Sequence, residues 1–561
     1  MRNFFKALWE LCKPFWGTKQ NWLAWLIFIT VILIGSGITY LNVRINDWQK
    51  VFYDVLAELK TDQIVPLMME YGIYIGIFVI INVYRTWLRK LLIIRWREAM
   101  TEQFIDKWLS KQIFYKLAHR KKMDNPDQRI AEDIRIFIEY SIELTVSLLF
   151  NVIQLFSFLM VLWRLSGKPE FTLFGETFVI EGYLVWVALI YAVVGTVLTH
   201  LIGRKLHGLN YQQQVYEANF RSSLIRKQDN AEQIALYKGE KTEKATLGRE
   251  FAEIVRNWRM LMDKERNLGF FTVGYSRFSI LLPTLLSIPL LIAKIVTIGG
   301  LMQIRTAFQV VLNSFSWFIY AYSSIPKWTS AVVRLNQLKQ EIDALENAVK
   351  MEIAETDKAI DTEKLAIFTP ENNRLLHDIS LSIEQNKWIY LKGQSGLGKS
   401  TLLRVLSGIW DYYDGQYRLP NQKSLLIPQR SYLNRGTLAD VLSYPDSGIY
   451  TEQQLNNVLE KVGMTRWVGY LDQEQNWAAV FSGGEQQRIA FARILLSKPN
   501  LLYLDEVTSS LDMHSAGELM QLLKDELPES TVIFISHQQG IARFADIEVD
   551  LTQFKSTNQA A

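Results

Sequence analysis

The chain has 561 residues, which is too long for one ordinary domain. Its composition is 49% hydrophobic and 12% aromatic but also 21% charged, which indicates an apolar part resident in a membrane joined to a soluble part of ordinary charge. The net charge of +4 requires no nucleic-acid partner, and the single cysteine, Cys12, excludes an intrachain disulfide and a cysteine-based metal cluster.

Residues 1–20 mix aromatic and basic side chains, among them Phe4, Trp9 and Lys13. This mixture favours an N-terminal elbow helix lying at the membrane surface, with an ordinary surface helix as the alternative. The next stretch, Trp22 to Leu41, has no charged residue over 20 positions. It is therefore long enough to cross a hydrocarbon core of about 30 Å as a helix.

Five more apolar segments follow, so we predict a six-helix transmembrane domain over residues 21–330. They are Ile64–Tyr84, Leu144–Trp163, Gly182–Gly203, Phe278–Ala293 and Ala307–Ile325. Polar groups at membrane depth are costly unless they face protein or water, so those near the segments either line a cavity or bond to neighbouring helices. As a hypothesis, five of them line a solute route: Glu70, Arg277, Arg305, Gln309 and Asn313.

Two long connections between the apolar segments are strongly basic. Residues 85–135 contain 13 Lys and Arg, and residues 204–266 contain another 13. The positive-inside rule therefore places these connections, both termini and the carboxy-terminal half in the cytoplasm. Because Trp96, Met100 and Phe104 recur at helical spacing, we expect the membrane helices to continue beyond the membrane.

A helical linker is predicted over residues 331–364. It begins with an apolar stripe typical of a packing face, at alternating spacings of three and four: Leu335, Leu338, Ile342, Leu345 and Val349. The charged, glycine-free segment Glu352–Lys364 follows. The soluble domain is expected to start near Leu365 and to occupy residues 365–561.

The soluble domain contains a complete phosphate-loop motif. Its residues are Gly393, Gln394, Ser395, Gly396, Leu397, Gly398, Lys399, Ser400 and Thr401. The apolar run Trp388–Leu391 precedes the loop as a predicted buried strand, and Leu402–Leu406 follows as a helical segment. This context predicts an α/β P-loop NTPase fold in which glycines bring backbone N–H groups close to a polyphosphate.

Two loop residues and two later carboxylates have predicted chemical roles. Lys399 would place its charge at the β- and γ-phosphates, and Ser400 would bind Mg²⁺. The apolar strand Leu501–Leu504 ends in Asp505, which would hold Mg²⁺, and Glu506, which would take a proton from the attacking water. Paired acids could also form a solvated turn, but their place after a complete phosphate loop favours the chemical role.

A second anion site is predicted where Ser482, Gly483 and Gly484 open a helix ahead of Glu485. A lone serine and two glycines would be a weak signal, but this group stands shortly before the carboxylate strand. The order of motifs resembles that of ABC transporters. The resemblance implies a transmembrane domain of exporter-like fold followed by an ABC nucleotide-binding domain that hydrolyses ATP.

The resemblance also implies roles for further residues. Gln429 is similar to the Q-loop glutamine, Ser510–Leu511–Asp512 to the D-loop, and His537 to the switch histidine. It thus implies a catalytic set of Glu506, His537, Gln429 and Lys399, and a metal set of Ser400, Gln429 and Asp505. In the family, Ser482 and Gly484 of one chain complete the ATP site of another, so one copy of each motif implies a homodimer with two composite sites.

Two segments of the membrane half, Asn125–Ile130 and Glu232–Glu243, are similar to cytoplasmic-loop motifs of one branch. That branch comprises the peroxisomal ABCD transporters and the SbmA/BacA-like bacterial proteins, including the YddA-like half-transporters. As bare chemistry these residues would be solvated helix faces and caps. The resemblance implies that they transmit force between the domains.

The sequence departs from the family pattern at three positions. Phe481 stands where leucine is commoner, and Glu485 where glutamine is commoner. The aromatic residue that stacks on adenine is expected near Thr369, where only the adjacent Phe368 is available.

These features predict an ATP-driven transporter of the inner (plasma) membrane that works by alternating access. The solute classes come only from the resemblance, which implies a peptide, a cobalamin-like compound, or an acyl-CoA or other lipid. An ATP-gated membrane regulator or channel that does not pump is the alternative, and the sequence separates the two poorly. A soluble ABC-type ATPase acting on nucleic acid is set aside because of the apolar spans.

Overall fold

The computed structural model of the protein describes residues 2–120, 126–167, 170–173, 176–292, 294–321, 324–347, 356–446 and 448–555. It divides into two compact units. The helical unit is Met1–Lys107 with Asn125–Glu341, and the sheet unit is Trp108–Asp124 with Ile342–Ala561. Some residues of the predicted segments lie outside the described residues: Asn125, Ala293, Tyr322, Ser323, Val349 and residues 352–355.

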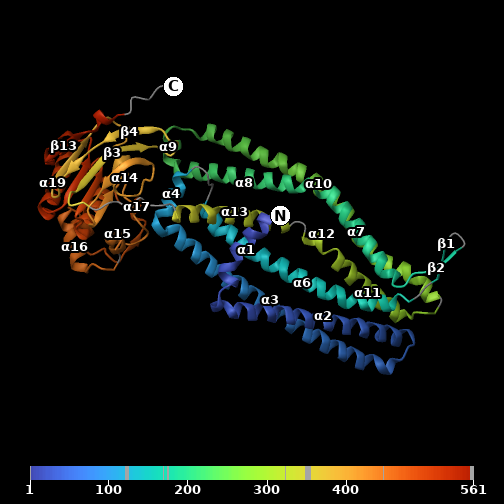
Figure 1. The fold of residues 1–561 in the computed structure, drawn as a ribbon. Coiled ribbons are helices and arrows are strands. Elements are labelled where there is room, and N and C mark those ends of the chain that lie inside the picture. The colour runs from blue at the N-terminus through green and yellow to red at the C-terminus, as the bar shows by residue number, and fades with distance from the viewer. Residues whose placement is uncertain are drawn as a thin grey trace. The chain divides into compact units, whose positions relative to one another are not determined.

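Long α-helices make up the helical unit (Figure 1). Their bounds are α1 Arg2–Trp16, α2 Trp22–Ala57, α3 Thr61–Leu109, α6 Ile134–Leu165, α7 Tyr183–Gly203, α8 Leu206–Asp229, α9 Ala231–Leu236, α10 Glu240–Ile292, α11 Ile298–Phe315, α12 Trp317–Ala321 and α13 Ser324–Glu346. The short helix α5, Pro126–Gln128, leads through a π-helical turn into α6. Strands β1 (Glu170–Leu173) and β2 (Glu176–Val179) form an antiparallel hairpin between α6 and α7.

Five helices are long and apolar enough to cross a membrane, namely α2, α3, α6, α7 and α10. They contain the first five predicted segments, so these are confirmed as long apolar helices over their described residues. The protein is therefore a membrane-spanning chain.

The sixth predicted segment, Ala307–Ile325, is not one continuous helix, so its predicted bounds are wrong. Ser316 is the C-cap of α11, with a φ of −84° and a ψ of 6°, and α12 begins at the next residue, Trp317. α11 begins earlier than predicted, where Gly299 lies against α2. A Cβ atom at Gly299 would lie 2.0 Å from the carbonyl oxygen of Lys50, so only glycine permits this approach.

The helical continuation of the long basic connections is confirmed. α3 extends to Leu109 and buries Trp96, Met100 and Phe104 along one face. In the second connection, α8 and α10 run side by side (Figure 1). The Asn257 side-chain amide of α10 joins them by donating to Gln213 of α8 at 2.8 Å.

Two larger sheets and the two-stranded antiparallel pair β9–β10 organise the sheet unit. The strands are β3 Ile360–Phe368, β4 Arg374–Ile379, β5 Ser382–Ile383, β6 Trp388–Lys392, β7 Tyr413–Arg418, β8 Ser424–Ile427, β9 Gly436–Thr437, β10 Glu474–Gln475, β11 Leu501–Asp505, β12 Thr531–Ile535 and β13 Ile547–Asp550. The helices are α4 Ile113–His119, α14 Lys399–Leu406, α15 Leu438–Ser443, α16 Glu452–Lys461, α17 Trp477–Val480, α18 Gly483–Ser497 and α19 Met513–Glu526.

The larger sheet is parallel, with the strand order β13-β6-β12-β11-β8. The predicted strands before the phosphate loop and before the paired carboxylates are confirmed as β6 and β11. Every residue of β11 and β12 is buried, as expected for central parallel strands covered on both faces. Because parallel strands end at one edge, the residues that follow β6, β8, β11 and β12 lie along the same edge.

β3 begins at Ile360, before the domain start near Leu365 that the sequence predicts. Ile360 and Thr362 are buried while Glu363 and Lys364 are exposed, so charged and buried positions are mixed along the strand. The outward charges explain why this segment resembles a linker in sequence. β3 pairs with β4, β5 and β7 in the second, antiparallel sheet.

The first basic connection contributes α4 to the sheet unit. The Lys116 ammonium forms an ion pair with the Asp411 carboxylate, and the His119 ring lies edge-on to Trp410 with ring centroids 5.2 Å apart. Tyr115 packs against the core beneath the antiparallel sheet. A segment assigned by sequence to the membrane domain is thus anchored on the carboxy-terminal half.

Candidate functional site

The phosphate loop lies between the end of β6 and the start of α14, as predicted. Gly396 and Gly398 have φ values of +80° and +104°, a backbone region that favours glycine. A Cβ atom at Gly398 would also meet the Leu375 Cβ at 3.3 Å. The glycines therefore allow a tight turn whose N–H groups, together with the first turn of α14, can surround an anion.

Lys399 curls back over the loop that precedes it. Its ammonium donates to the carbonyl oxygens of Gly393 at 2.7 Å and of Gln394 at 3.0 Å. Burial lowers the pKa of the Lys399 ammonium, and the nearby carboxylates of Glu506 and Asp505 oppose that shift. The loop thus holds one positive charge at its centre, where polyphosphate would bind.

Ser400 and Asp505 meet at the base of the loop. The Ser400 hydroxyl donates to Asp505 Oδ1 at 2.8 Å, and Asp505 is buried as the last residue of β11. A hydroxyl and a carboxylate are hard oxygen ligands of the kind that Mg²⁺ prefers. The residues present therefore fit the ion that the sequence implies at this place.

Glu506 lies between His537 and Gln429 at the edge of the parallel sheet. Its Oε1 is 2.9 Å from His537 Nε2, and its Oε2 accepts from the Gln429 amide at 3.0 Å. Glu506 itself has a φ of +53°, a strained conformation for a side-chain-bearing residue, and its N–H bonds to the Ile535 carbonyl. The structure thus brings together three predicted site residues, which follow β8, β11 and β12.

Ser482 begins α18 with a capping box. The Glu485 N–H donates to the Ser482 hydroxyl, and the Glu485 carboxylate accepts from the Ser482 N–H at 3.1 Å and from its hydroxyl at 2.8 Å. Ser482 and Gly483 are exposed, whereas Phe481 is buried against Trp477. The sequence-predicted helix start is confirmed, and its N-terminus is accessible to an anion.

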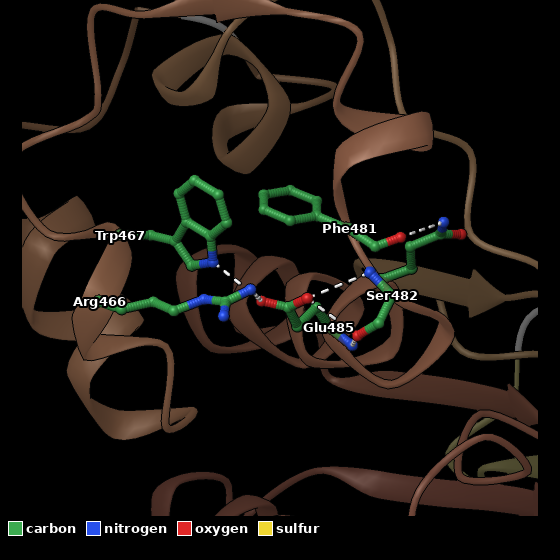
Figure 2. A network of polar contacts seen from close by, with 6 residues as sticks. Arg466, Trp467, Phe481, Ser482 and Glu485 are labelled. Atoms are coloured by element: carbon green, nitrogen blue, oxygen red, sulfur yellow. Dashed lines mark hydrogen bonds and ion pairs between the residues drawn. The ribbon is translucent and has the colours of Figure 1, made fainter.

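Two residues that sequence reasoning missed bind the other side of the same carboxylate. Figure 2 shows Glu485 between Ser482 on one side and Arg466 and Trp467 on the other. The Arg466 guanidinium forms an ion pair with Glu485 Oε1, and Trp467 Nε1 donates to that oxygen at 2.9 Å. No recurring motif marks these residues in the sequence, so only the fold reveals their contact.

The D-loop residues connect α18, the signature helix, to the edge of the parallel sheet where Glu506 and His537 lie. The Gln487 side chain donates to Ser509 at 3.1 Å and accepts from the Ser510 N–H at 2.9 Å. Gln538, next to His537, donates to the carbonyl of Leu511 at 2.9 Å. Sequence reasoning identified Ser510–Leu511–Asp512 but missed these two glutamines, because a glutamine inside a helix or after a strand has no distinctive pattern.

Phe368, the predicted neighbour of the adenine, ends β3 and is half-buried. The Arg374 guanidinium lies over its ring at 5.6 Å from the centroid. Thr369 bonds through its backbone to Asn373 in the turn that follows. One face of the Phe368 ring is therefore already covered by a cation.

Comparisons with known proteins agree with this geometry. The family described as ABC transporter transmembrane region 2 matches residues 10–291, and the family described as ABC transporter matches residues 376–509. The inner membrane ABC transporter ATP-binding protein YddA of Escherichia coli strain K12 is 34% identical over 545 residues, covering 97% of this chain and 96% of that protein. The chain belongs to the ABC transporter family. It is an ATP-binding, ATP-hydrolysing membrane transporter of the half-transporter type.

Other relatives confirm the predicted branch and fold of this ABC transporter. The human lysosomal cobalamin transporter ABCD4 is 25% identical over 602 residues, covering 98% of this chain and 94% of that protein. The chloroplastic ABC transporter D family member 2 of Arabidopsis thaliana is 28% identical over 620 residues, covering 97% and 85%. A solved bacterial Atm1-family ABC exporter with ATP bound has a TM-score of 0.75 at 16% identity and covers 95% and 94%, which shows the exporter fold.

The polar residues predicted near membrane depth fall on different helices of the transporter. Arg305, Gln309 and Asn313 are spaced by four on α11 and form one stripe, with Gln309 donating to Asn313 at 3.1 Å. Glu70 on α3 accepts from Tyr74 in the next turn, and Arg277 is exposed on α10. The structure therefore groups three of the five residues.

A cavity of about 320 Å³ adjoins the α11 stripe within the helical unit. It is lined by Glu143, Ser147, Asn151, Asn313 and Trp317 among others, and Trp317 Nε1 donates to the Ser147 hydroxyl at 3.1 Å. Sequence reasoning missed Glu143 and Asn151, which lie on α6. Their place beside Asn313 extends the polar stripe across two helices.

Proposed function

We propose that this ABC transporter works as a homodimer, in which each ATP is held by the phosphate loop of one subunit and the signature helix of the other. The proposal is supported by a contrast between the residues around the phosphate loop and the residues at the start of α18. The loop, Asp505, Glu506 and their partners converge within one chain, whereas Ser482 at the start of α18 bonds through its side chain only to Glu485 among the described residues. A second copy would supply the nucleotide that this exposed helix N-terminus can bind.

Each site residue has a definite part in the proposed reaction. Lys399 and the loop N–H groups hold the phosphates, and Glu506 accepts a proton from the water that attacks the γ-phosphorus. His537 and Gln429 hold the Glu506 carboxylate in place. Mg²⁺ held by Ser400, Asp505 and Gln429 would neutralise charge on the phosphates.

The cytoplasmic tip of the helical unit supports the proposal of a second copy. Leu236, at the end of α9, and Tyr237, which follows it, are 75% and 87% exposed. Large apolar side chains this exposed at a loop tip are typical of a surface that contacts another protein. In the proposed dimer this tip contacts the partner's nucleotide-binding domain and couples ATP closure to the membrane helices.

We further propose that the transporter lies in the inner membrane with its nucleotide-binding domains in the cytoplasm. The basic character of the α3–α6 and α8–α10 connections supports this orientation. The stripe of Arg305, Gln309 and Asn313 supports a water-accessible solute route, because such side chains are costly against lipid. A peptide, a cobalamin-like compound and an acyl-CoA or other lipid are the solute classes to be tested.

The test is transport into sealed vesicles that contain the reconstituted protein. We expect ATP, but not ADP, to drive accumulation of one of the three solute classes against its concentration difference, and that solute to stimulate ATP hydrolysis. Equilibration without accumulation would instead establish an ATP-gated channel. Alanine at Arg305 or Asn313 should reduce solute-stimulated hydrolysis while leaving basal hydrolysis in place, and unchanged stimulation would exclude the stripe as part of the route.

A further inference from the structure

The Glu485 carboxylate is fully occupied by hydrogen-bond donors from two segments of the chain. Oε2 accepts from the Ser482 N–H and hydroxyl, and Oε1 accepts from Arg466 and from Trp467 Nε1 (Figure 2). Three of these four donors do not depend on the Ser482 hydroxyl. The carboxylate can therefore release that hydroxyl to another anion and still remain hydrogen-bonded.

A glutamine could not make the same set of bonds. Its side-chain amide has one oxygen, and its nitrogen would point either at the Ser482 donors or at Arg466 and Trp467, which are donors too. The glutamate at position 485 and the arginine at position 466 therefore match each other. This match gives a physical reason for the departure from the glutamine that is commoner at this place.

Packing fixes the side chains of Arg466 and Trp467, the two donors that lie outside α18 and its N-cap. The Arg466 guanidinium lies over the Trp467 ring at 4.9 Å from its centroid, and the ring meets Phe481 edge-on at 5.2 Å. Trp467 also meets Trp477 edge-on at 5.6 Å. An aromatic cluster thus holds the indole N–H toward the start of α18.

The negative charge of Glu485 makes Arg466 and Trp467 important for nucleotide binding. Burial of Glu485 opposes its ionisation, but the hydrogen bonds from Trp467 and Ser482 and the charge of Arg466 outweigh burial and hold the pKa of Glu485 below its ordinary value. Glu485 is therefore an anion at neutral pH. An uncompensated anion at this helix N-terminus would repel the phosphates of an incoming nucleotide.

We propose that Arg466 and Trp467 are positioning residues for the start of α18. They hold the Glu485 carboxylate in place and neutralise its charge, so that Ser482 and the N-terminus of α18 can bind the ATP of the second subunit. This role rests on the composite site described under Proposed function. Neither residue touches the nucleotide in this account. Both act through Glu485.

The test compares ATP hydrolysis by full-length protein carrying Arg466→Ala with that of the parent. We expect the KM for ATP to rise about tenfold, because Glu485 becomes an uncompensated charge facing phosphate, with a smaller change in kcat. Trp467→Phe keeps the aromatic packing and removes one donor, so its KM should rise less. The KM defect of Arg466→Ala should shrink as salt is added, because salt screens the repulsion.

The deciding variant combines Arg466→Ala with Glu485→Gln, which removes both charges. We expect this pair to restore the KM to within about twofold of the parent, whereas a purely structural role for Arg466 would leave the pair as impaired as the single change. Lys461→Ala is the matched control. It removes an exposed cation from an ion pair with Glu526, the last residue of α19, and should leave the KM unchanged.

An unchanged KM in Arg466→Ala, or a failure of Glu485→Gln to restore it, would overturn the proposed roles of Arg466 and Trp467. These outcomes differ from a failure of the composite site itself. In that case the parent would bind and hydrolyse ATP without any dependence on a second chain, whatever stands at position 466.

Discussion

The two halves of the ATP site differ in how far one chain completes them. Around the phosphate loop, the Ser400 hydroxyl reaches Asp505 at 2.8 Å, and Glu506 lies within 3.0 Å of both His537 and Gln429. Around the signature helix, the exposed N-cap Ser482 bonds through its side chain to its capping-box partner, Glu485. The catalytic half is thus assembled by the parallel sheet of one subunit, whereas the signature half ends at a surface.

This difference indicates at which part of the ATP site hydrolysis can be regulated. Glu506, His537 and Gln429 follow adjacent strands and need no partner to converge. The signature helix depends on bonds from Arg466 and Trp467, which lie in the short 3₁₀ helix Thr465–Trp467, and on Gln487, which ties it to the D-loop. Changes in the first half should therefore affect the chemical step, and changes in the second should affect how ATP brings two subunits together.

The largest effect should come from Glu506→Gln in the catalytic half. We expect kcat for ATP hydrolysis to fall by about 10²–10⁴-fold because the general base is lost, while ATP binding is retained because the loop is intact. Rapid hydrolysis assays and retention of labelled ATP would measure the two quantities. Hydrolysis at the parental rate would show that Glu506 is not the base.

A smaller effect should come from Gln487→Leu, which breaks the link between the two halves. Gln487 is buried and bonds to Ser509 and Ser510, so we expect a loss of about 1 kcal/mol in the free energy of unfolding and a fall in kcat as the D-loop loses its position. Gln521→Leu, on an exposed face of α19, is the matched control and should change neither quantity. A Gln487→Leu protein with parental kcat would show that the link is not needed.

The smallest effect on ATP hydrolysis should come from a second capping box, at Thr451 and Gln454 of α16. Thr451→Ala should cost about 1 kcal/mol of stability, as loss of an N-cap does, without changing the KM for ATP. Ser482→Ala should cost a similar stability and also raise the KM, because that cap faces nucleotide. Equal KM values in the two variants would remove the distinction between the two caps. Thermal unfolding and initial-rate assays measure both quantities.

Much of the catalytic half could be predicted because its signals are local. In the catalytic half, the phosphate loop and the strand before Asp505 each combine a motif with an apolar run of the right period; in the signature half, the helix opened by Ser482 does the same, and the structure confirms all three. The roles of Gln429 and His537 are implied only by the family resemblance, and the parallel order of β8, β11 and β12 explains why both residues meet Glu506.

The remaining features could not be predicted because they depend on tertiary contacts. Trp467 lies 18 residues before Glu485 in the sequence, and only the packing of two segments brings them together. The early start of α11 depends on a glycine that lets α2 approach, and β3 resembles a linker because its outward residues are charged. The ion pair of α4 with Asp411 and its ring contact with Trp410 likewise join segments about 300 residues apart.

The central claim, that each ATP is held by two chains, is tested most directly with mixed dimers. One chain carries Lys399→Ala, which disables the phosphate loop, and the other carries Gly484→Asp, which places a carboxylate at the start of the signature helix; two affinity tags isolate the mixed dimer. The account predicts that each variant alone is inactive and that the mixed dimer regains ATP hydrolysis, because one of its two sites then combines an intact loop with an intact signature helix. A purified mixed dimer that binds ATP but hydrolyses none would contradict the account.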